Sequence, residues 1–160
     1  MNFTLSKKGV TLIELLVAIV ILSLCLPPFF NFLTSSIFNT KYSSDYTNAF
    51  FLGEDKLEEL MYKDFNSNEL NDTLSSNNDN LNPAIDKNSI LNNFANYVSS
   101  TFDHYQISNY KNTTFYIFWN IADDNTISSL FNYKRIVVIV YWIDKGKGHK
   151  ISYETIRRGT

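Results

Sequence analysis

One apolar run, interrupted by a single carboxylate, limits most strongly what this chain can fold into. Between Val10 and Leu26 the only polar side chains are Thr11, Glu14 and Ser23. The apolar residues continue to position 33. At 1.5 Å per residue, a helix over 10–33 is long enough to cross a hydrocarbon core about 30 Å thick. The run therefore predicts a membrane-spanning helix at residues 10–33.

Lys7 and Lys8 stand just before this run, which places the N-terminus in the cytoplasm and the rest of the chain outside. A secretory signal peptide also begins with lysines and an apolar run. However, no A-x-A-like cleavage site follows cleanly, and Pro27 and Pro28 interrupt the place where one would fall. The pattern favours a retained anchor. The two prolines predict a kink or a short unwound stretch, or else mark the point where the chain leaves the membrane.

Glu14 is expensive to place in a membrane unless a positive charge accompanies it. A cut between Gly9 and Val10 would create an ammonium group one helical turn before Glu14. The ammonium of a neighbouring subunit could meet the same carboxylate. In apolar surroundings such a pair would fix the axial register of two subunits, because a shifted neighbour leaves a charge unpaired.

The run G-V-T-L-I-E over 9–14, continued by LLVAIVIL, resembles the N-terminal signature of type IV prepilins and pseudopilins. The resemblance implies that a prepilin peptidase cuts after Gly9 and methylates Val10, where phenylalanine is commoner. It implies that Glu14 neutralises the amino terminus of a neighbour during assembly. The implied partners are prepilin peptidase, other pilin or pseudopilin subunits and an assembly platform. The implied location is the bacterial inner membrane, followed by a pilus or pseudopilus.

The rest of the chain predicts one modest domain of the α+β class, in which a long N-terminal helix packs against a small C-terminal antiparallel sheet. The predicted segments are a leader at 1–9, the anchor at 10–33, an amphipathic helix at 34–65, an Asn-rich loop with a possible short helix at 66–112, and the sheet at 113–160. In the amphipathic segment an apolar stripe is expected to face the domain, with Glu54, Asp55, Glu58 and Glu59 facing away. The stripe comprises Tyr42, Tyr46, Ala49, Phe50, Gly53, Leu57, Leu60 and Met61.

The segment 66–96 holds eleven asparagines and few apolar residues, which predicts a long exposed loop. It lacks the spacing of a calcium loop. Ile90, Phe94, Tyr97 and Val98 return to helical spacing and predict a short helix.

Three strands are predicted after this loop: Thr113–Ala122, a central strand Lys134–Asp144 and a half-exposed strand His149–Arg157. The turns between them are expected at ADDNT and at GKG, residues 146–148. Ile151 and Tyr153 should face inward, whereas Arg157 and Arg158 should end in solvent.

Two further stretches resemble minor pilins of the PilV type. AFFLGEDKLEEL, residues 49–60, resembles the run that follows the anchor in those proteins, with Gly53 in place of the usual alanine. The sheet resemblance is carried by Trp119, Asp123, Val138, Val140, Trp142, Asp144 and Thr155. The single cysteine, Cys25, excludes an internal disulfide, which favours a minor component over a major pilin.

The sequence predicts a structural subunit, not an enzyme, and neither a cofactor nor a metal. His104 and His149 lack metal-ligand spacing and are expected to be surface histidines with ordinary partners. With a net charge of −2, the chain has no overall excess of positive charge that would favour binding to nucleic acid. Two alternatives stay open. One is a tip-located module for adhesion or DNA uptake, using aromatics such as Tyr105, Tyr110 and Tyr116. The other is an enzyme or sensor on a plain anchor. The sequence also leaves open whether the subunit serves a pilus, type II secretion or competence.

Overall fold

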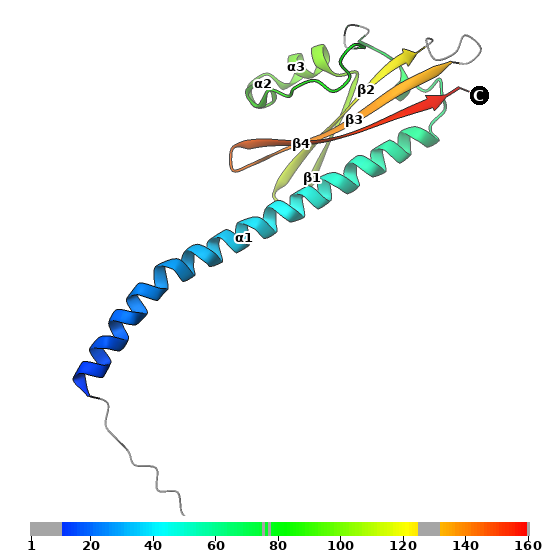
Figure 1. Cartoon of the computed structure of the whole chain (residues 1–160). Helices are drawn as coiled ribbons and strands as arrows, with labels where there is room; N and C mark the ends of the chain where they lie inside the picture. Colours follow the sequence, from blue (N-terminus) through cyan, green and yellow to red (C-terminus); the bar gives the residue numbers. More distant parts are fainter. Residues whose placement is uncertain (1–10, 75, 77, 125–131, 160) are drawn as a thin grey trace, which may run out of the picture. The chain divides into compact units, whose positions relative to one another are not determined.

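The computed structural model describes residues 11–74, 76, 78–124 and 132–159. One long helix, α1 (Leu12–Tyr62), comes first, followed by the short 3-10 helix η1 (Asn68–Leu70), α2 (Lys87–Asn92) and α3 (Phe94–Thr101) (Figure 1). Four strands complete the chain: β1 (His104–Tyr110), β2 (Thr113–Asp124), β3 (Tyr133–Asp144) and β4 (Lys147–Arg158). The predicted α+β fold class is confirmed. The chain divides into two compact units, Met1–Ser43 and Ser44–Thr160, and each is considered by itself.

The first unit, as far as it is described, is the N-terminal half of α1, and its side chains from Thr11 to Ser43 are exposed. Leu12 and Leu24 are 81% and 71% exposed, for example. This helix is long and apolar enough to cross a membrane, and none of its most apolar window is buried within the structure. An apolar helix with no protein around it needs either lipid or other helices as its surroundings.

The two prolines do not unwind α1, because the helix continues through Pro27 and Pro28. The predicted unwound stretch is therefore wrong. Each proline removes a single amide donor, and the hydrogen bonds of the residues around it are enough to hold the turn.

The second unit begins with the C-terminal half of α1, whose buried face is partly the predicted one. Ala49, Gly53 and Leu60 are buried, as expected, and the four predicted outward carboxylates are exposed. Tyr42, Tyr46, Phe50 and Met61 belong to the predicted stripe but are exposed. Two charged residues, Asp45 and Lys56, take up the buried face with the other three. The predicted stripe included neither of these charged residues, because it was drawn from the apolar side chains alone.

The sheet is an antiparallel meander in the order β1-β2-β3-β4, so each strand pairs with the next in the chain. The three predicted strands correspond to β2, β3 and β4, and β3 is central, as expected. Ile151 and Tyr153 are half-buried between exposed neighbours, which confirms the predicted alternation in β4. The strand β1 was missed. The turn predicted at ADDNT, residues 122–126, is wrong over its first three residues, because β2 continues to Asp124, and its last two residues lie outside the described part.

Each face of the sheet has its own core. Facing α1, Phe115, Ile117, Trp119 and Ile121 of β2 pack with Ile136, Val138, Val140 and Trp142 of β3. The opposite face packs against the segment that carries α2 and α3, through residues such as Phe118, Ile139, Val98 and Phe102 (Figure 1). Because both faces of the sheet are covered, β2 and β3 carry apolar side chains on both of their faces.

The segment 66–96 is only in part the exposed loop that its composition predicts. Leu70, Leu81 and Ile90 are buried, and the amide of the fully buried Asn120 donates to the carbonyl of Leu81 over 2.9 Å. The predicted short helix is present as two helices, α2 and α3, which meet at Asn93. Asp86 caps α2 by accepting from the amides of Asn88 and Ser89. The segment is a layer of the domain held at intervals by single apolar side chains.

The two hairpin turns that the structure describes each carry a lysine in the left-handed region. Lys111, between β1 and β2, has φ 53°, and Lys145, between β3 and β4, has φ 49°. The second turn is Lys145–Gly146, where Gly146 has φ 74°, so the tight turn predicted at residues 146–148 begins earlier. A residue with a Cβ in this region costs roughly 1–2 kcal/mol. Gly148 instead belongs to β4, where a Cβ would meet the Tyr141 hydroxyl oxygen at 2.2 Å.

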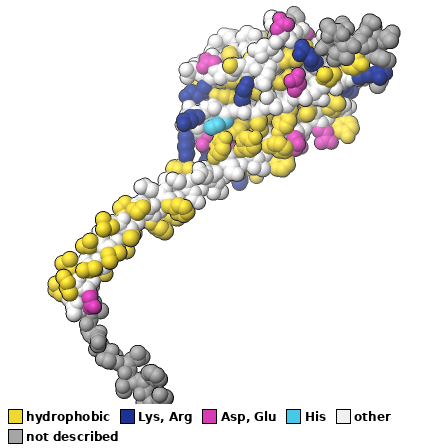
Figure 2. Space-filling model, in the orientation of Figure 1, with side chains coloured by type: hydrophobic (Ala, Val, Ile, Leu, Met, Phe, Trp, Pro, Cys, Tyr) yellow, Lys and Arg dark blue, Asp and Glu magenta, His cyan; other side chains and the backbone are white. Residues whose placement is uncertain are grey.

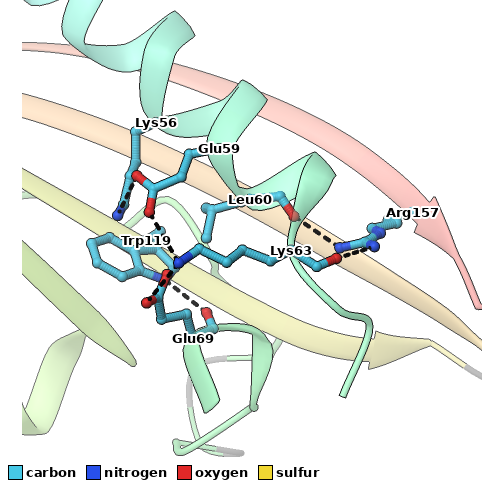
Figure 3. A network of polar contacts seen from close by, with 7 residues as sticks. All are labelled: Lys56, Glu59, Leu60, Lys63, Glu69, Trp119 and Arg157. Atoms are coloured by element: carbon cyan, nitrogen blue, oxygen red, sulfur yellow. Dashed lines mark hydrogen bonds and ion pairs between the residues drawn. The ribbon is translucent and has the colours of Figure 1, made fainter. Parts of the chain in front are cut away.

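Arg157 does not end in solvent, contrary to the prediction. Its guanidinium donates to the carbonyl oxygens of Leu60, at 2.8 Å, and of Lys63 (Figure 3). The last carbonyls of a helix have no partner within it, so a planar donor with several N–H groups can satisfy two of them at once. The next residue, Arg158, is exposed. Arg157 thus joins the last strand to the end of α1.

Replacing Arg157 with Gln should lower the free energy of unfolding of the full chain in detergent by about 1–2 kcal/mol, the scale for partly exposed hydrogen bonds from a charged donor. The change removes the fork that reaches both carbonyls. Chemical denaturation followed by circular dichroism measures the loss. The neighbouring change Arg158→Gln is the control and should stay within about 0.5 kcal/mol. Equal losses for the two variants would contradict the role assigned to Arg157.

Candidate assembly segment

The start of α1 is closed by a reciprocal pair of side chains, Thr11 and Glu14. The Thr11 hydroxyl oxygen accepts from the amide of Glu14 at 3.3 Å. In return, Glu14 Oε2 accepts from the Thr11 amide at 2.9 Å and from the Thr11 hydroxyl at 3.0 Å. This is a capping box, with threonine as the N-cap and glutamate three residues later.

The capping box gives Glu14 partners within its own chain, which the sequence analysis did not consider. Both bonds to the carboxylate go to Oε2, so Oε1 has no hydrogen bond among the described residues. The carboxylate also lies at the positive end of the helix dipole, which favours a negative charge. The signal was present in the sequence: T-L-I-E before an apolar run is the capping-box pattern. A local role therefore exists beside the predicted intersubunit one.

Four predicted site residues, Lys7, Lys8, Gly9 and Val10, lie outside the described residues. Of the predicted set, the structure thus places Glu14 only. Glu14 lines a shallow groove on the helix surface together with Ile13, Val17, Ala18 and Ile21. Cys25 is exposed on the same apolar helix.

A second polar cluster lies at the C-terminal end of α1, over Trp119 (Figure 3). Glu59 accepts from Lys56 at 3.0 Å and lies 3.5 Å from Lys63, which donates to Glu69 at 3.2 Å. The hydrogen bond from Lys56 lowers the pKa of Glu59, and the hydrogen bond to Glu69 raises the pKa of Lys63. Both shifts favour the charged forms of these two side chains.

Trp119 completes this cluster as a structural residue. Its indole N–H donates to the Glu69 carbonyl at 2.9 Å, and the Lys56 ammonium lies 4.1 Å from the ring centre. A hollow beside it is lined by these charges and by Asp103, His104 and Gln106. The two lysines and two glutamates balance one another, so the cluster ties α1 to η1 and β2.

The two histidines have ordinary partners, as predicted. His104 lies 2.9 Å from the Asn71 carbonyl oxygen and stacks on Trp119, and His149 stacks on Trp142. Within the described residues, no group of three or more His, Cys, Asp and Glu could hold a metal ion. Of the aromatics considered for a binding tip, Tyr105 and Tyr110 are about half exposed, at 52% and 47%. Tyr116 is half-buried against Phe94 and Phe118.

Residues 4–26 match the prokaryotic N-terminal methylation motif. The match covers part of the predicted leader and the first part of α1, and it includes both Thr11 and Glu14. The chain thus carries a type IV prepilin-like segment, joined to a globular unit with a pilin-like arrangement of helix and antiparallel sheet. No curated protein and no solved structure matches the chain.

Proposed function

We propose that this protein is a minor pilin or pseudopilin, a structural subunit of a type IV pilus or a related pseudopilus. The observation that carries the proposal is a methylation motif at residues 4–26 on a helix whose N-terminal half exposes its apolar side chains. Prepilin peptidase cuts after Gly9 and methylates Val10. The exposed helix then passes from the inner membrane into the packed helical core of a filament. The minor role is supported by the single cysteine, which leaves the C-terminal region without a disulfide.

In this proposal the N-terminus starts in the cytoplasm, held there by Lys7 and Lys8, and the sheet lies on the outer side of the inner membrane. Glu14 sets the axial register between subunits. Its Oε2 is committed to Thr11, and its Oε1 accepts from the methylated amino group of a neighbouring Val10. The remaining partners are the assembly platform and other pilin subunits.

Replacing Gly9 with Val should abolish processing, because the peptidase would meet a branched side chain at the bond it cuts. Protein recovered from membranes should then begin at Met1. The unaltered protein should begin at Val10 with one added methyl group. N-terminal sequencing and intact mass measure both.

The matched control is Val10→Phe, which places the commoner residue after the cut and should be processed normally. Recovery of the unaltered protein with residues 1–9 still attached would contradict the proposal and favour a plain membrane anchor.

A further inference from the structure

The two strained lysines lie at the same end of the sheet. Phe115 of β2 pairs with Trp142 of β3. The turn that precedes β2 and the turn that follows β3 each lie within three residues of this pair. Lys111 is in the turn before β2, and Lys145 is in the turn after β3. In each turn a lysine takes a backbone conformation that glycine or asparagine would take with less strain. Because both turns place a lysine in this strained conformation, the lysine side chains themselves are expected to have a function at this end of the sheet.

Further lysines gather around these turns. Lys147 begins β4, and Lys150 lies three residues on and donates to the carbonyl oxygen of Pro83. Lys87 donates to the carbonyl oxygen of Gly146 at 2.7 Å, which holds the start of α2 against the second turn. Figure 2 shows lysine and arginine side chains at both ends of the globular unit, and one of these groups lies around a histidine. We call Lys87, Lys111, Lys145, Lys147 and Lys150 the basic end.

Of the acidic side chains near the basic end, Asp45 and Asp144 are buried and Asp86 is exposed. Asp45 and Asp144 are 6% and 8% exposed, and Asp45 accepts from the Thr113 hydroxyl at 3.1 Å. Asp86 caps α2. Exposed charge at this end of the unit is therefore mainly positive, although the whole chain has a net charge of −2.

The contacts of the second unit also place the start of its part of α1 at the basic end. Asp45 bonds Thr113, the first residue of β2, and Tyr46 lies edge-on to Trp142 with 6.3 Å between ring centres. Along the chain only residues 34–44 separate Asp45 from the end of the apolar run. Eleven helical residues extend about 17 Å. This stretch contains Lys41 and no acidic residue.

We propose that the basic end binds the anionic phospholipid surface of the membrane that α1 crosses. The headgroup layer on one side of a bilayer occupies about 5–8 Å of those 17 Å, and the remaining distance is close to a Debye length of about 8–10 Å. Lysines within this distance are attracted to acidic headgroups, and the attraction falls as salt screens it. The inference needs α1 in a membrane but does not need filament assembly, so it extends beyond the proposed function.

The test is hydrogen–deuterium exchange of the full chain reconstituted in two kinds of vesicle, phosphatidylcholine alone and phosphatidylcholine with about 30% phosphatidylglycerol as the acidic lipid. In the acidic vesicles we expect amides around the two turns, near 110–114 and 144–148, to exchange at least about threefold more slowly. The difference should disappear in high salt. Equal exchange in both vesicles would overturn the proposal.

The variant is Lys111→Asn with Lys145→Asn and Lys147→Gln. Asparagine accepts a positive φ more readily than lysine, so this variant should fold at least as stably, and its thermal midpoint checks that. We expect it to lose the difference between the vesicles, whereas Arg158→Gln, which removes an exposed cation from the last position of β4, should keep it. A lipid difference that survives in the triple variant would overturn the proposal.

Two further exchange measurements distinguish a lipid surface from other sources of phosphate. Protection of the turns by inorganic phosphate in phosphatidylcholine vesicles, equal to that by phosphatidylglycerol, would assign the basic end to a free anion and overturn the lipid surface. Protection by duplex DNA without any effect of acidic lipid would assign it to nucleic acid and also overturn it.

Discussion

Glu14→Gln should be processed normally after Gly9 but should fail to join filaments. Glutamine keeps an oxygen that can accept from Thr11, so the capping box survives and the helix still begins at Leu12. What it loses is the charge that pairs with a neighbour's terminal ammonium. We expect its share in sheared filaments to fall by about tenfold or more, as expected when a desolvated charge loses its partner. Immunoblotting of the filament and membrane fractions measures that share.

Glu14→Ala removes both the charge and the cap, and it should fail at least as badly. Thr11→Val is the matched control, because it removes the hydroxyl from the cap and leaves the carboxylate charged. Normal incorporation of Glu14→Gln, together with failure of Glu14→Ala and Thr11→Val, would show that Glu14 serves only to begin its own helix. That outcome would contradict the proposed role of Glu14 in setting the axial register between subunits.

Phe118→Ala should destabilise the globular unit by about 3–5 kcal/mol, the range for a fully buried aromatic side chain. Phe118 is fully buried, and its ring stacks on that of Phe102 with 4.1 Å between centres. The change leaves a cavity between the sheet and the segment that carries α3. The thermal midpoint should fall by roughly 10–20 °C for a unit of this size.

Near-ultraviolet circular dichroism of the full chain in detergent measures that midpoint. Phe51→Ala is the control, since Phe51 is on α1 and 56% exposed, and its midpoint should change little. A loss below about 1 kcal/mol for Phe118→Ala would mean that segment 81–102 packs only loosely and that its description as a structural layer is wrong.

Sequence patterns predicted the elements whose own residues carry a strong period. The apolar run and the 3.6-residue spacing predicted α1, and β-branched and aromatic runs predicted β2 and β3. β1 was missed because its sequence, HYQISNY, is largely polar. The strand lies at the edge of the sheet, and most of its side chains are exposed. An edge strand needs few apolar residues, so composition alone resembles a loop.

The remaining errors concern contacts made across the fold. Arg157 was placed in solvent because nothing near it in sequence shows that the unsatisfied carbonyls of Leu60 and Lys63 lie beside it. Lys56 was not recognised as buried because the ring that its ammonium lies over, Trp119, belongs to a strand far away in the sequence. At the candidate site the motif was visible, and the capping partner of Glu14 was visible too but was not considered. The intersubunit role of Glu14 remains a prediction.

The close approach of Gly53 to Tyr153 has a mechanical consequence for the globular unit. A Cβ at position 53 would lie 2.3 Å from the tyrosine ring, and the tyrosine hydroxyl donates to the Phe50 carbonyl at 3.1 Å. If α1 slid along the sheet by one turn, Ala49 or Leu57 would arrive under that ring, where a side chain has no room. Tension on the N-terminal end should therefore be borne by the whole unit, without the helix slipping along the strands.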